Sequence, residues 1–373
     1  MIAHDYLTQR GGAERVVLAM HRAFPGAPIY TTFYDPDLTF PEFRDATVIT
    51  SPLNCIAPLR RNVRAALPLL PFIVSAVRVP GDVVLTSSTG WAHGFRTRGR
   101  QLVYCHSPAR WLYLSRQYLG GPLWKTPRGW ALGILRPFLV LWDRRAAARP
   151  EAYVCNSRVV EQRIRKVYGR EAPVLHPPHS FDTTGDQTPI PEAASHMHTG
   201  DFFLMVSRLL PYKNVQVAAE AFRSLPENLL IIGNGPLRDE LRRNAPRNVV
   251  IASDVTDAQM RWAYARARAV LAPSYEDFGI TPLEGAAYGK PTIALRAGGY
   301  LDTVVENTTG VFMEMVDVES IREAVRDFRP ETWDADAIMT HARSFSEPVF
   351  RDRIRAAVGE LQTRTGQDSQ ADG

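Results

Sequence analysis

The chain has 373 residues, of which 45% are hydrophobic and 22% charged, which is enough to build two domains of ordinary size. Its net charge of +5 suits a phosphate-bearing ligand or an anionic membrane surface. Nucleic acid would fit the charge alone. The sequence contains no zinc-finger, helix-turn-helix or ribonucleoprotein pattern, so a nucleic-acid partner is not expected.

Targeting and redox signals in the sequence favour a cytoplasmic protein. The chain opens without the apolar run of a signal peptide, and its longest apolar stretch, Trp130–Trp142, is too short to span a bilayer. The three cysteines, Cys55, Cys105 and Cys155, are widely spaced and fit no metal-ligand pattern. We therefore expect buried thiols in a reducing compartment.

Short apolar strands alternate with helical segments through residues 1–182. The first strand, Met1–Tyr6, leads through Gly11 and Gly12 into a helix over Ala13–Phe24. The two glycines are a weak candidate phosphate loop and lack the spacing of a dinucleotide site. Further strands are expected at Ile29–Phe33, Val48–Thr50, Val83–Ser87, Leu102–Cys105 and Tyr153–Asn156. This order predicts an α/β domain around a doubly wound parallel sheet.

Two stretches of this half are basic and aromatic. Ile56–Pro80 has no acid among its leucines, prolines and arginines, and Arg110–Arg149 has the single acid Asp143. The arginines of the first stretch are Arg60, Arg61, Arg64 and Arg78. Such a pattern is typical of a surface that contacts anionic lipid. A solvated face beside an ordinary core explains it equally well.

Residues 183–200 are polar and aperiodic, and we interpret them as a linker between domains. A second alternating series, residues 201–345, predicts a second parallel sheet. Its strands are expected at Phe202–Val206, Leu229–Ile232, Val249–Ala252, Ala269–Ala272 and Thr292–Leu295. Later helices are expected at Glu319–Phe328, Thr332–Ser344 and Pro348–Leu361, and residues 363–373 are predicted to be disordered.

The segment Ser274–Glu284 joins a buried strand to a helix. We place Thr281 at the N-cap and Pro282 at the first helical position. Glu276 follows the strand at its carboxyl end, where open α/β sheets bind ligands, whereas a simple capping box explains Glu284 equally well. Such a helix start offers amides to a phosphate-bearing ligand, here those of Phe278, Gly279, Ile280 and Thr281.

Polar or glycine-rich residues follow four strands of the second half. They are Arg208 with Lys213, Gly233–Pro236, Ser253–Thr256 and Glu276–Glu284. Because parallel strands end at one edge of a sheet, we expect these tips to form one crevice. The two cations suit a diphosphate there, the arginine through its fork and the lysine as a point charge. In the first half, His106 follows a strand and is a candidate cleft residue.

These pieces, in this order, resemble the retaining glycosyltransferases of family 4 over nearly the whole chain. The likeness rests on Gly11–Arg15, His106–Pro108, Ser207–Arg208 with Lys213, Gly233–Pro236, and Glu276 with seven residues before Glu284. His-Asp-Tyr-Leu near the start and Pro-Tyr-Lys resemble bacterial O-antigen mannosyltransferases that use GDP-mannose. The resemblance implies the GT-B fold, with two Rossmann-like domains facing across a cleft. Its last helix, residues 346–361, would return to the first domain.

The resemblance also implies a role for each site residue. Arg208 and Lys213 would bind the donor diphosphate and stabilise its growing charge, with an amide from Gly12 of the opposite domain. The sugar would contact Glu276, the amides of residues 278–281, and His106 near the acceptor. Glu284 would contact the ribose of the nucleotide sugar, and Asp254 and Val255 would contact its base. Gly233 would contact the nucleotide sugar in the same crevice. No cofactor and no metal is implied.

The implied reaction moves a hexose, mannose from GDP-mannose, to a hydroxyl of a saccharide or lipid-linked saccharide in polysaccharide synthesis, with retained configuration. An anionic surface of the inner membrane leaflet is the further partner that the basic aromatic stretches suggest. Three alternatives stay open. They are a UDP- or other NDP-sugar transferred to a small natural product, a GT-B-fold nucleotide-sugar epimerase, and a non-catalytic partner subunit, which the intact site residues disfavour.

Overall fold

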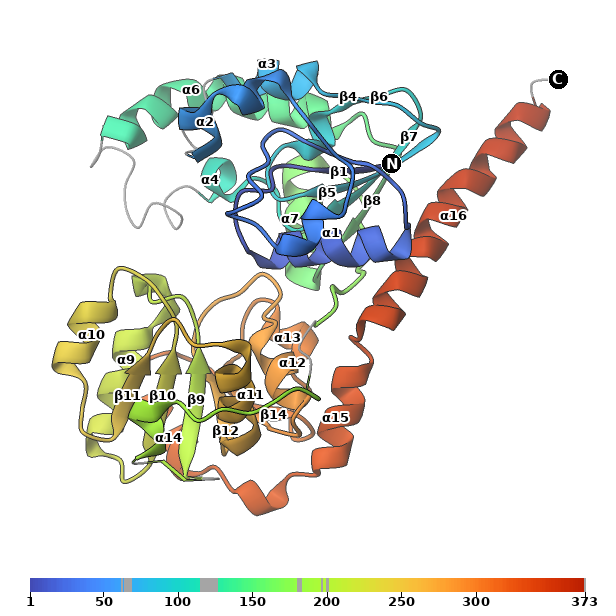
Figure 1. The fold of residues 1–373 in the computed structure, drawn as a ribbon. Coiled ribbons are helices and arrows are strands. Elements are labelled where there is room, and N and C mark those ends of the chain that lie inside the picture. The colour runs from blue at the N-terminus through green and yellow to red at the C-terminus, as the bar shows by residue number, and fades with distance from the viewer. Residues whose placement is uncertain are drawn as a thin grey trace. The chain divides into compact units, whose positions relative to one another are not determined.

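The computed structural model describes residues 1–61, 63, 69–114, 127–179, 183–195, 197–198 and 201–371. Figure 1 shows the chain as two compact units, which are described here one at a time. The first unit comprises Met1–Pro178 and Glu347–Gly373, and the second comprises His179–Ser346. The segment expected to be a linker, residues 183–200, falls within the second unit and contains the short helix α8 (Pro191–Ala194).

The first unit is built on a six-stranded parallel sheet in the order β3-β2-β1-β5-β7-β8. The strands are β1 (Ile2–His4), β2 (Ile29–Thr31), β3 (Val48–Thr50), β5 (Val83–Ser88), β7 (Arg100–Cys105) and β8 (Ala152–Cys155). A separate parallel pair is formed by β4 (Arg78–Val79) and β6 (Arg96–Thr97). The helices are α1 (Gly12–Ala23), α2 (Ala57–Arg61), α3 (Leu70–Ala76), α4 (Arg110–Tyr113), α6 (Pro127–Ala147), α7 (Arg158–Tyr168) and α16 (Glu347–Ala371).

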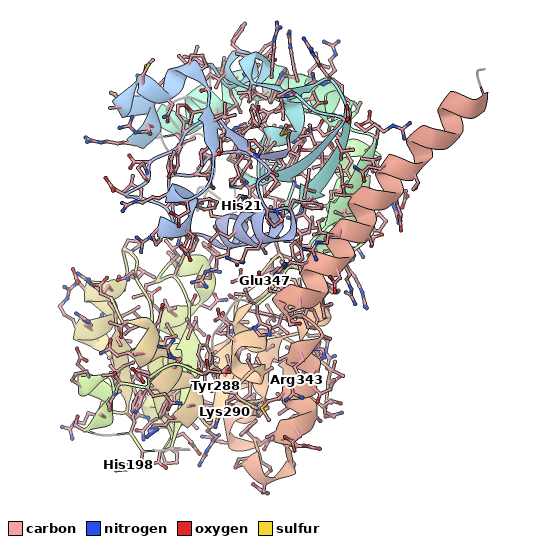
Figure 2. The ribbon with its side chains drawn as sticks, turned by 45° about the vertical axis from the view of Figure 1, so that its right-hand side comes forward. His21, His198, Tyr288, Lys290, Arg343 and Glu347 are labelled. Atoms are coloured by element: carbon pink, nitrogen blue, oxygen red, sulfur yellow. The ribbon has the colours of Figure 1, made fainter. Side chains whose placement is uncertain are left out.

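The last helix, α16, packs against α1 and completes the core of the first unit. Phe350 and Ile354 on α16 are buried in one apolar cluster with Tyr104 of β7, and the Phe350 and Tyr104 rings meet edge to face. Glu347 begins α16 (Figure 2), where both of its carboxylate oxygens accept hydrogen bonds from Arg22 of α1 at 2.6 Å. Helix α16, at the end of the sequence, is therefore part of the same unit as Met1–Pro178.

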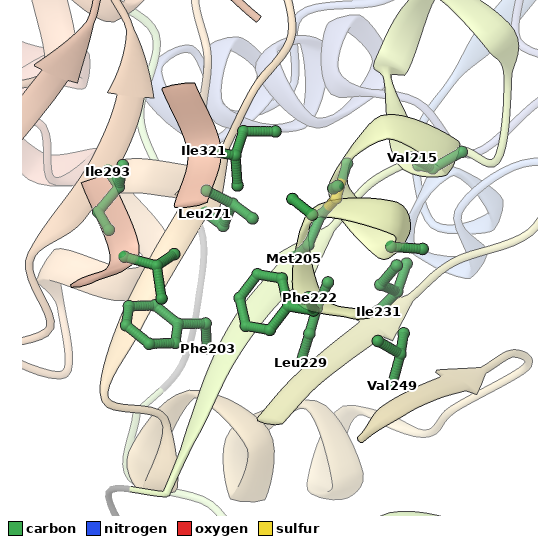
Figure 3. Packing of buried hydrophobic residues seen from close by; sticks show 14 of the residues in the cluster. Phe203, Met205, Val215, Phe222, Leu229, Ile231, Val249, Leu271, Ile293 and Ile321 are labelled. Atoms are coloured by element: carbon green, nitrogen blue, oxygen red, sulfur yellow. The ribbon is translucent and has the colours of Figure 1, made fainter. Parts of the chain in front are cut away.

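The second unit repeats the plan with the order β11-β10-β9-β12-β13-β14. Its strands are β9 (Phe202–Val206), β10 (Asn228–Ile232), β11 (Val249–Ala252), β12 (Ala269–Ala272), β13 (Thr292–Leu295) and β14 (Gly310–Met313). Its longer helices are α9 (Val215–Ala221), α10 (Arg238–Asn244), α11 (Asp257–Arg266), α12 (Thr281–Ala286), α13 (Tyr300–Thr303), α14 (Val318–Arg326) and α15 (Ala335–Arg343). Figure 3 shows Phe203, Phe222 and Leu271 packed between this sheet and its helices.

The pair of parallel six-stranded sheets confirms the predicted fold class of two Rossmann-like domains, and the contact of α16 with α1 confirms that the last helix returns to the first. Three details differ from expectation. The short edge strand β14 was not predicted, and α16 continues to Ala371 through most of the tail expected to be disordered. Cys105 and Cys155 are buried as expected, but Cys55 is exposed, because it ends a surface turn of 3₁₀ helix, Pro52–Cys55.

None of the helices in the described part of the chain is long and apolar enough to cross a membrane. The two basic aromatic stretches are described only in part, since Arg64 and residues 115–126 lie outside the described residues.

The packing of α16 predicts the effect of Ile354→Ala. This side chain is fully buried, so its truncation leaves a cavity and should lower the free energy of unfolding by about 2–5 kcal/mol. Urea denaturation followed by circular dichroism measures the change. The neighbouring Arg353 is exposed, and Arg353→Ala should stay within about 0.5 kcal/mol of the original protein. Equal stability of the two variants would contradict the docked helix.

Candidate functional site

The loops that follow β9 and β10 are joined through their backbones. Ser207 N–H donates to the Ile232 carbonyl at 3.0 Å, and Leu209 N–H donates to the Asn234 carbonyl at 2.9 Å. A Cβ atom on Gly233 would lie 1.8 Å from the Ser207 carbonyl oxygen, so only glycine fits there. Gly233 thus holds the loop that carries the exposed Arg208.

Lys213 and Glu276 are in direct contact at the carboxyl ends of the neighbouring strands β9 and β12. The lysine side chain is 11% exposed and the glutamate 23%, so their attraction is less screened than on an open surface. Ser274 donates its hydroxyl to the same carboxylate oxygen at 2.8 Å. Asn214, in the left-handed conformation at φ 58°, donates its side-chain amide to the Pro273 carbonyl at 2.7 Å and fixes the turn after Lys213.

The tip of β13 supports the loop that contains Glu276. Gly299 N–H donates to the Glu276 carbonyl at 2.8 Å, and a Cβ on Gly298 would lie 2.3 Å from that same oxygen. The Tyr300 hydroxyl lies 3.3 Å from Ser274 Oγ, and burial together with the charge of Glu276 raises the pKa of Tyr300. Sequence reasoning missed Ser274, Asn214 and Tyr300 as supports, because only the fold brings them to the pair.

The helix after this loop begins differently from expectation. The predicted N-cap at Thr281 is wrong, because Ile280 is the N-cap and Thr281 and Pro282 are the first two helical residues. Gly279 has φ +81°, which allows Ile280 to enter the helical conformation at once. Ile280 has no side chain that can cap the helix, so a capping box does not explain Glu284. Instead, the Glu284 carboxylate accepts a hydrogen bond from the Tyr264 hydroxyl of α11 at 2.6 Å.

The amides expected to face a ligand lie in this loop. Phe278 is buried, whereas Gly279, Ile280 and Thr281 are half-buried. Within the described residues, the N–H groups of these last three donate to no backbone carbonyl. A Cβ on Gly279 would lie 2.4 Å from the Tyr300 ring, so this residue has to be glycine for its packing as well as for its φ.

The tip of β11 carries Asp254 and Val255. Asp254 is exposed, has φ 56°, and accepts a hydrogen bond from the Asn234 side chain at 3.1 Å, which links it to the β10 loop. Val255 is half-buried against the apolar cluster of α11. The four predicted tips of the second unit therefore share one sheet edge, since their strands are parallel neighbours.

Two predicted site residues belong to the first unit. Gly12 is the first residue of α1, and a Cβ there would have no heavy atom within 4 Å. His106 directly follows β7, is half-buried, and has Nε2 2.9 Å from Ser87 Oγ. Burial, followed by the positive charges of His4 and Arg110, lowers the pKa of His106 to about 3. That these residues meet those of the second unit in one site stays a prediction.

No group of three histidine, cysteine, aspartate or glutamate side chains in the described residues could hold a metal ion. Two Asp-x-Asp sequences, Asp35–Asp37 and Asp334–Asp336, match a metal-binding pattern. In the structure Asp35 pairs with Arg60 at 3.2 Å, and Asp334 caps the start of α15.

A comparison with known proteins finds a family whose sequence matches that of the second unit. Residues 186–338 match the family described as glycosyl transferases group 1. The matched segment lies within the second unit, and the match identifies the chain as a glycosyltransferase. The chain is 24% identical to the alpha-1,3/1,6-mannosyltransferase ALG2 of Rhizomucor pusillus, over 96% of this chain and 91% of that protein.

Two further comparisons extend the likeness. The glycosyltransferase is 29% identical to the GDP-mannose-dependent alpha-(1-6)-phosphatidylinositol monomannoside mannosyltransferase of Mycolicibacterium smegmatis, over 54% of this chain and 59% of that protein. Its fold is similar to Anabaena HepE in complex with UDP, with a TM-score of 0.67, 16% identity, and coverage of 96% and 99% of the two chains. The predicted GT-B fold is thus confirmed.

The contact between the β9 and β10 loops predicts the effect of Gly233→Ala. The new methyl group must displace the Ser207 carbonyl, so the variant should lose about 1–3 kcal/mol of stability and bind nucleotide diphosphates more weakly. Thermal unfolding with and without nucleotide measures both effects. Gly359→Ala in α16 is the matched control, because a Cβ there meets nothing within 4 Å. If the two variants behave alike, the close approach at Gly233 is wrong.

Proposed function

We propose that this glycosyltransferase moves mannose from GDP-mannose to a hydroxyl of a saccharide or lipid-linked saccharide, with retained configuration, in polysaccharide synthesis. The observation that carries the proposal is the contact of Lys213 with Glu276 at adjacent strand ends. A nucleotide sugar needs both partners of this pair, a cation for its phosphates and a carboxylate for its sugar hydroxyls. The family match supports the class of reaction, and the two mannosyltransferase relatives support the donor.

The cations would stabilise the leaving diphosphate. Negative charge grows on the phosphate as the glycosidic bond breaks, and a lysine fixed at the sheet edge would interact with it without reorganising. Arg208, exposed in the loop after β9, would add a planar fork of N–H donors for phosphate oxygens. Gly12 would add its amide from the first unit.

Glu276 suits sugar binding better than nucleophilic attack. One carboxylate oxygen already contacts the Lys213 ammonium and accepts from the Ser274 hydroxyl, and both interactions lower its nucleophilicity. This supports a front-side displacement in which the leaving phosphate assists the acceptor hydroxyl, rather than a covalent intermediate on the carboxylate. The amides of residues 278–281 would hold the sugar and His106 would lie near the acceptor.

The rest of the donor would extend along the same edge. Glu284 is oriented by Tyr264 and would accept hydrogen bonds from the ribose hydroxyls. Asp254 and Val255, at the tip of β11, would contact the base. A UDP-sugar is the alternative donor, because HepE, which shares the fold, was solved with UDP.

An anionic membrane surface is the further partner that we propose, and α3 and α6 support it. Phe72 of α3 and Ile134 of α6 are 70% and 76% exposed. Phe138 and Leu141 continue the exposed stripe of α6 at helical spacing. Phe72 and Phe138 line one open hollow together with Arg78 and Arg96. Exposed apolar side chains beside arginines fit a bilayer with negative headgroups, where a lipid-linked acceptor would be found.

The lysine–glutamate contact predicts the effect of Lys213→Ala on turnover with GDP-mannose. Without the ammonium, the leaving diphosphate loses its nearest fixed charge, and kcat should fall about 100- to 1000-fold. Release of GDP in the presence of a saccharide acceptor measures the rate. Arg326→Ala, an exposed cation on α14, is the control and should leave kcat unchanged. Unchanged turnover in Lys213→Ala would contradict the site, and turnover only with UDP-sugars would contradict the donor.

The exposed aromatic residues predict the effect of a Phe72→Ser, Phe138→Ser double variant on membrane binding. Each phenylalanine that enters the interface contributes more than about 1.4 kcal/mol, so losing both should lower the affinity for vesicles containing phosphatidylglycerol at least about a hundredfold. Co-sedimentation with vesicles measures this loss. Leu301→Ser, an exposed apolar residue of the second unit, should bind like the original protein. An original protein that stays in the supernatant would exclude the membrane surface and favour a small soluble acceptor.

A further inference from the structure

A row of buried polar side chains crosses the carboxyl ends of three neighbouring strands in the first unit. His4 ends β1, Ser87 lies near the end of β5, and His106 directly follows β7. The strands pair in register, with His4 opposite Ser87 and Ser87 opposite Tyr104. Glu14, in the first turn of α1, adds a fourth member through His4. Of these residues, only His106 has a role in the function proposed above.

Each residue of the row lies within contact or hydrogen-bond distance of the next. His4 Nε2 lies 3.7 Å from Glu14 Oε1, and His4 Nδ1 lies 3.0 Å from Ser87 Oγ and 3.1 Å from the Ser87 carbonyl oxygen. Ser87 Oγ lies 2.9 Å from His106 Nε2. His4, Glu14 and Ser87 are each at most 1% exposed. Such isolation from water makes every hydrogen bond in the row costly to lose.

The carbonyl acceptor fixes the direction of the first hydrogen bond, and the single hydroxyl hydrogen of Ser87 links it to the second. A carbonyl oxygen only accepts, so His4 Nδ1 must carry a hydrogen, which it shares between the carbonyl and the hydroxyl of Ser87. The Ser87 hydroxyl therefore accepts from His4 and has its own hydrogen to donate. Among the contacts of the Ser87 hydroxyl within the described residues, His106 Nε2 at 2.9 Å is the group left to accept that hydrogen. With Nε2 accepting, the hydrogen of the neutral His106 ring resides on Nδ1.

We propose that Glu14, His4 and Ser87 are positioning residues that hold His106 as the tautomer with its hydrogen on Nδ1. In this form His106 is a fixed N–H donor toward an oxygen of the sugar or acceptor, and it does not act as the general base. The inference rests on the proposed function for the position of His106, whereas the tautomer itself follows from the first unit alone.

The charges around the row agree with this arrangement. Burial lowers the pKa of His4, but the hydrogen bond and charge of Glu14, the charge of Asp5 and the Ser87 carbonyl together raise it above the ordinary value. The raised pKa favours the charged form of His4, and burial, followed by the charges of His4 and Arg110, lowers the pKa of His106 and favours its neutral form. Gln9 donates to Glu14 Oε1 at 3.0 Å, and Glu14 Oε2 has no hydrogen-bond partner among the described residues. A charged His4 balances that carboxylate.

Nitrogen-15 NMR of histidine-labelled protein tests the tautomer directly, with the His106 signals assigned by their loss in His106→Ala. In the original protein Nδ1 should give the signal of a protonated nitrogen and Nε2 that of an unprotonated one. Ser87→Ala removes the donor, so His106 should shift toward the form with hydrogen on Nε2. The kcat for GDP-mannose should fall about tenfold with little change in KM. Ser88→Ala, whose hydroxyl bonds His93 instead, is the matched control and should change neither signal.

A second variant tests the charge in the row. Glu14→Gln keeps the shape of the side chain but removes the carboxylate that favours the charged His4. The His106 titration seen by NMR should then move upward from about 3, because its positive neighbour is lost. In the original protein, His106 should show no titration between about pH 5 and 8.

The outcomes separate the two proposals. Hydrogen on His106 Nε2 in the original protein, or a Ser87→Ala spectrum identical to it, overturns the positioning role whatever the activity. If the tautomer changes as expected but His106→Ala turns over GDP-mannose normally, the buried row stands. In that case the place of His106 in the proposed function is wrong.

Discussion

The contact between the Lys213 ammonium and the Glu276 carboxylate organises the working edge of the second unit. The two residues come from different strand ends, and the loops that carry them are fixed by the neighbouring tips. Glycines at positions 233, 298 and 299 allow backbones to meet where any side chain would collide. An ion pair that is only partly hydrated loses much if it is misplaced, so the surrounding loops have to be rigid. The same rigidity is what a preorganised site for a charged leaving group requires.

The first unit also places polar residues at the carboxyl ends of its strands. There the residues at the strand ends are neutral or paired within the unit, and the histidine after β7 is kept neutral by burial and by its charged neighbour. The Asp5 carboxylate, just beyond β1, accepts hydrogen bonds from the Trp91 and Ala92 amides at 2.8 and 2.6 Å and shapes the loop after β5. The second unit thus carries an ion pair at its sheet edge, whereas the first carries a histidine whose lowered pKa favours the neutral form.

The sequence was sufficient to predict the features that depend on local pattern. Apolar runs of four to six residues located nearly all strands of both sheets, because buried parallel strands need them. That Lys213 and Glu276 lie at one sheet edge could be predicted, since parallel strands end together, whereas their direct contact was not predicted. The helix start at Ile280 could not be predicted, because it depends on the positive φ of Gly279 and on the packing of Gly279 against Tyr300. Ser274, Tyr264 and the row from Glu14 to Ser87 have ordinary residue types, and only the folded chain shows what they touch.

The assignment of residues 347–371 to the first unit has a consequence for biosynthesis. The second unit is inserted, in effect, into the first, and it is complete in sequence at Ser346. The first unit still lacks Phe350, Ile354 and Leu361 at that point, and these side chains close the apolar cluster against α1. During translation, the apolar surface of the first unit that α16 covers therefore stays exposed until α16 has been synthesised. The part of the protein made first is the last to mature, and a premature stop codon near the end would damage the beginning of the chain.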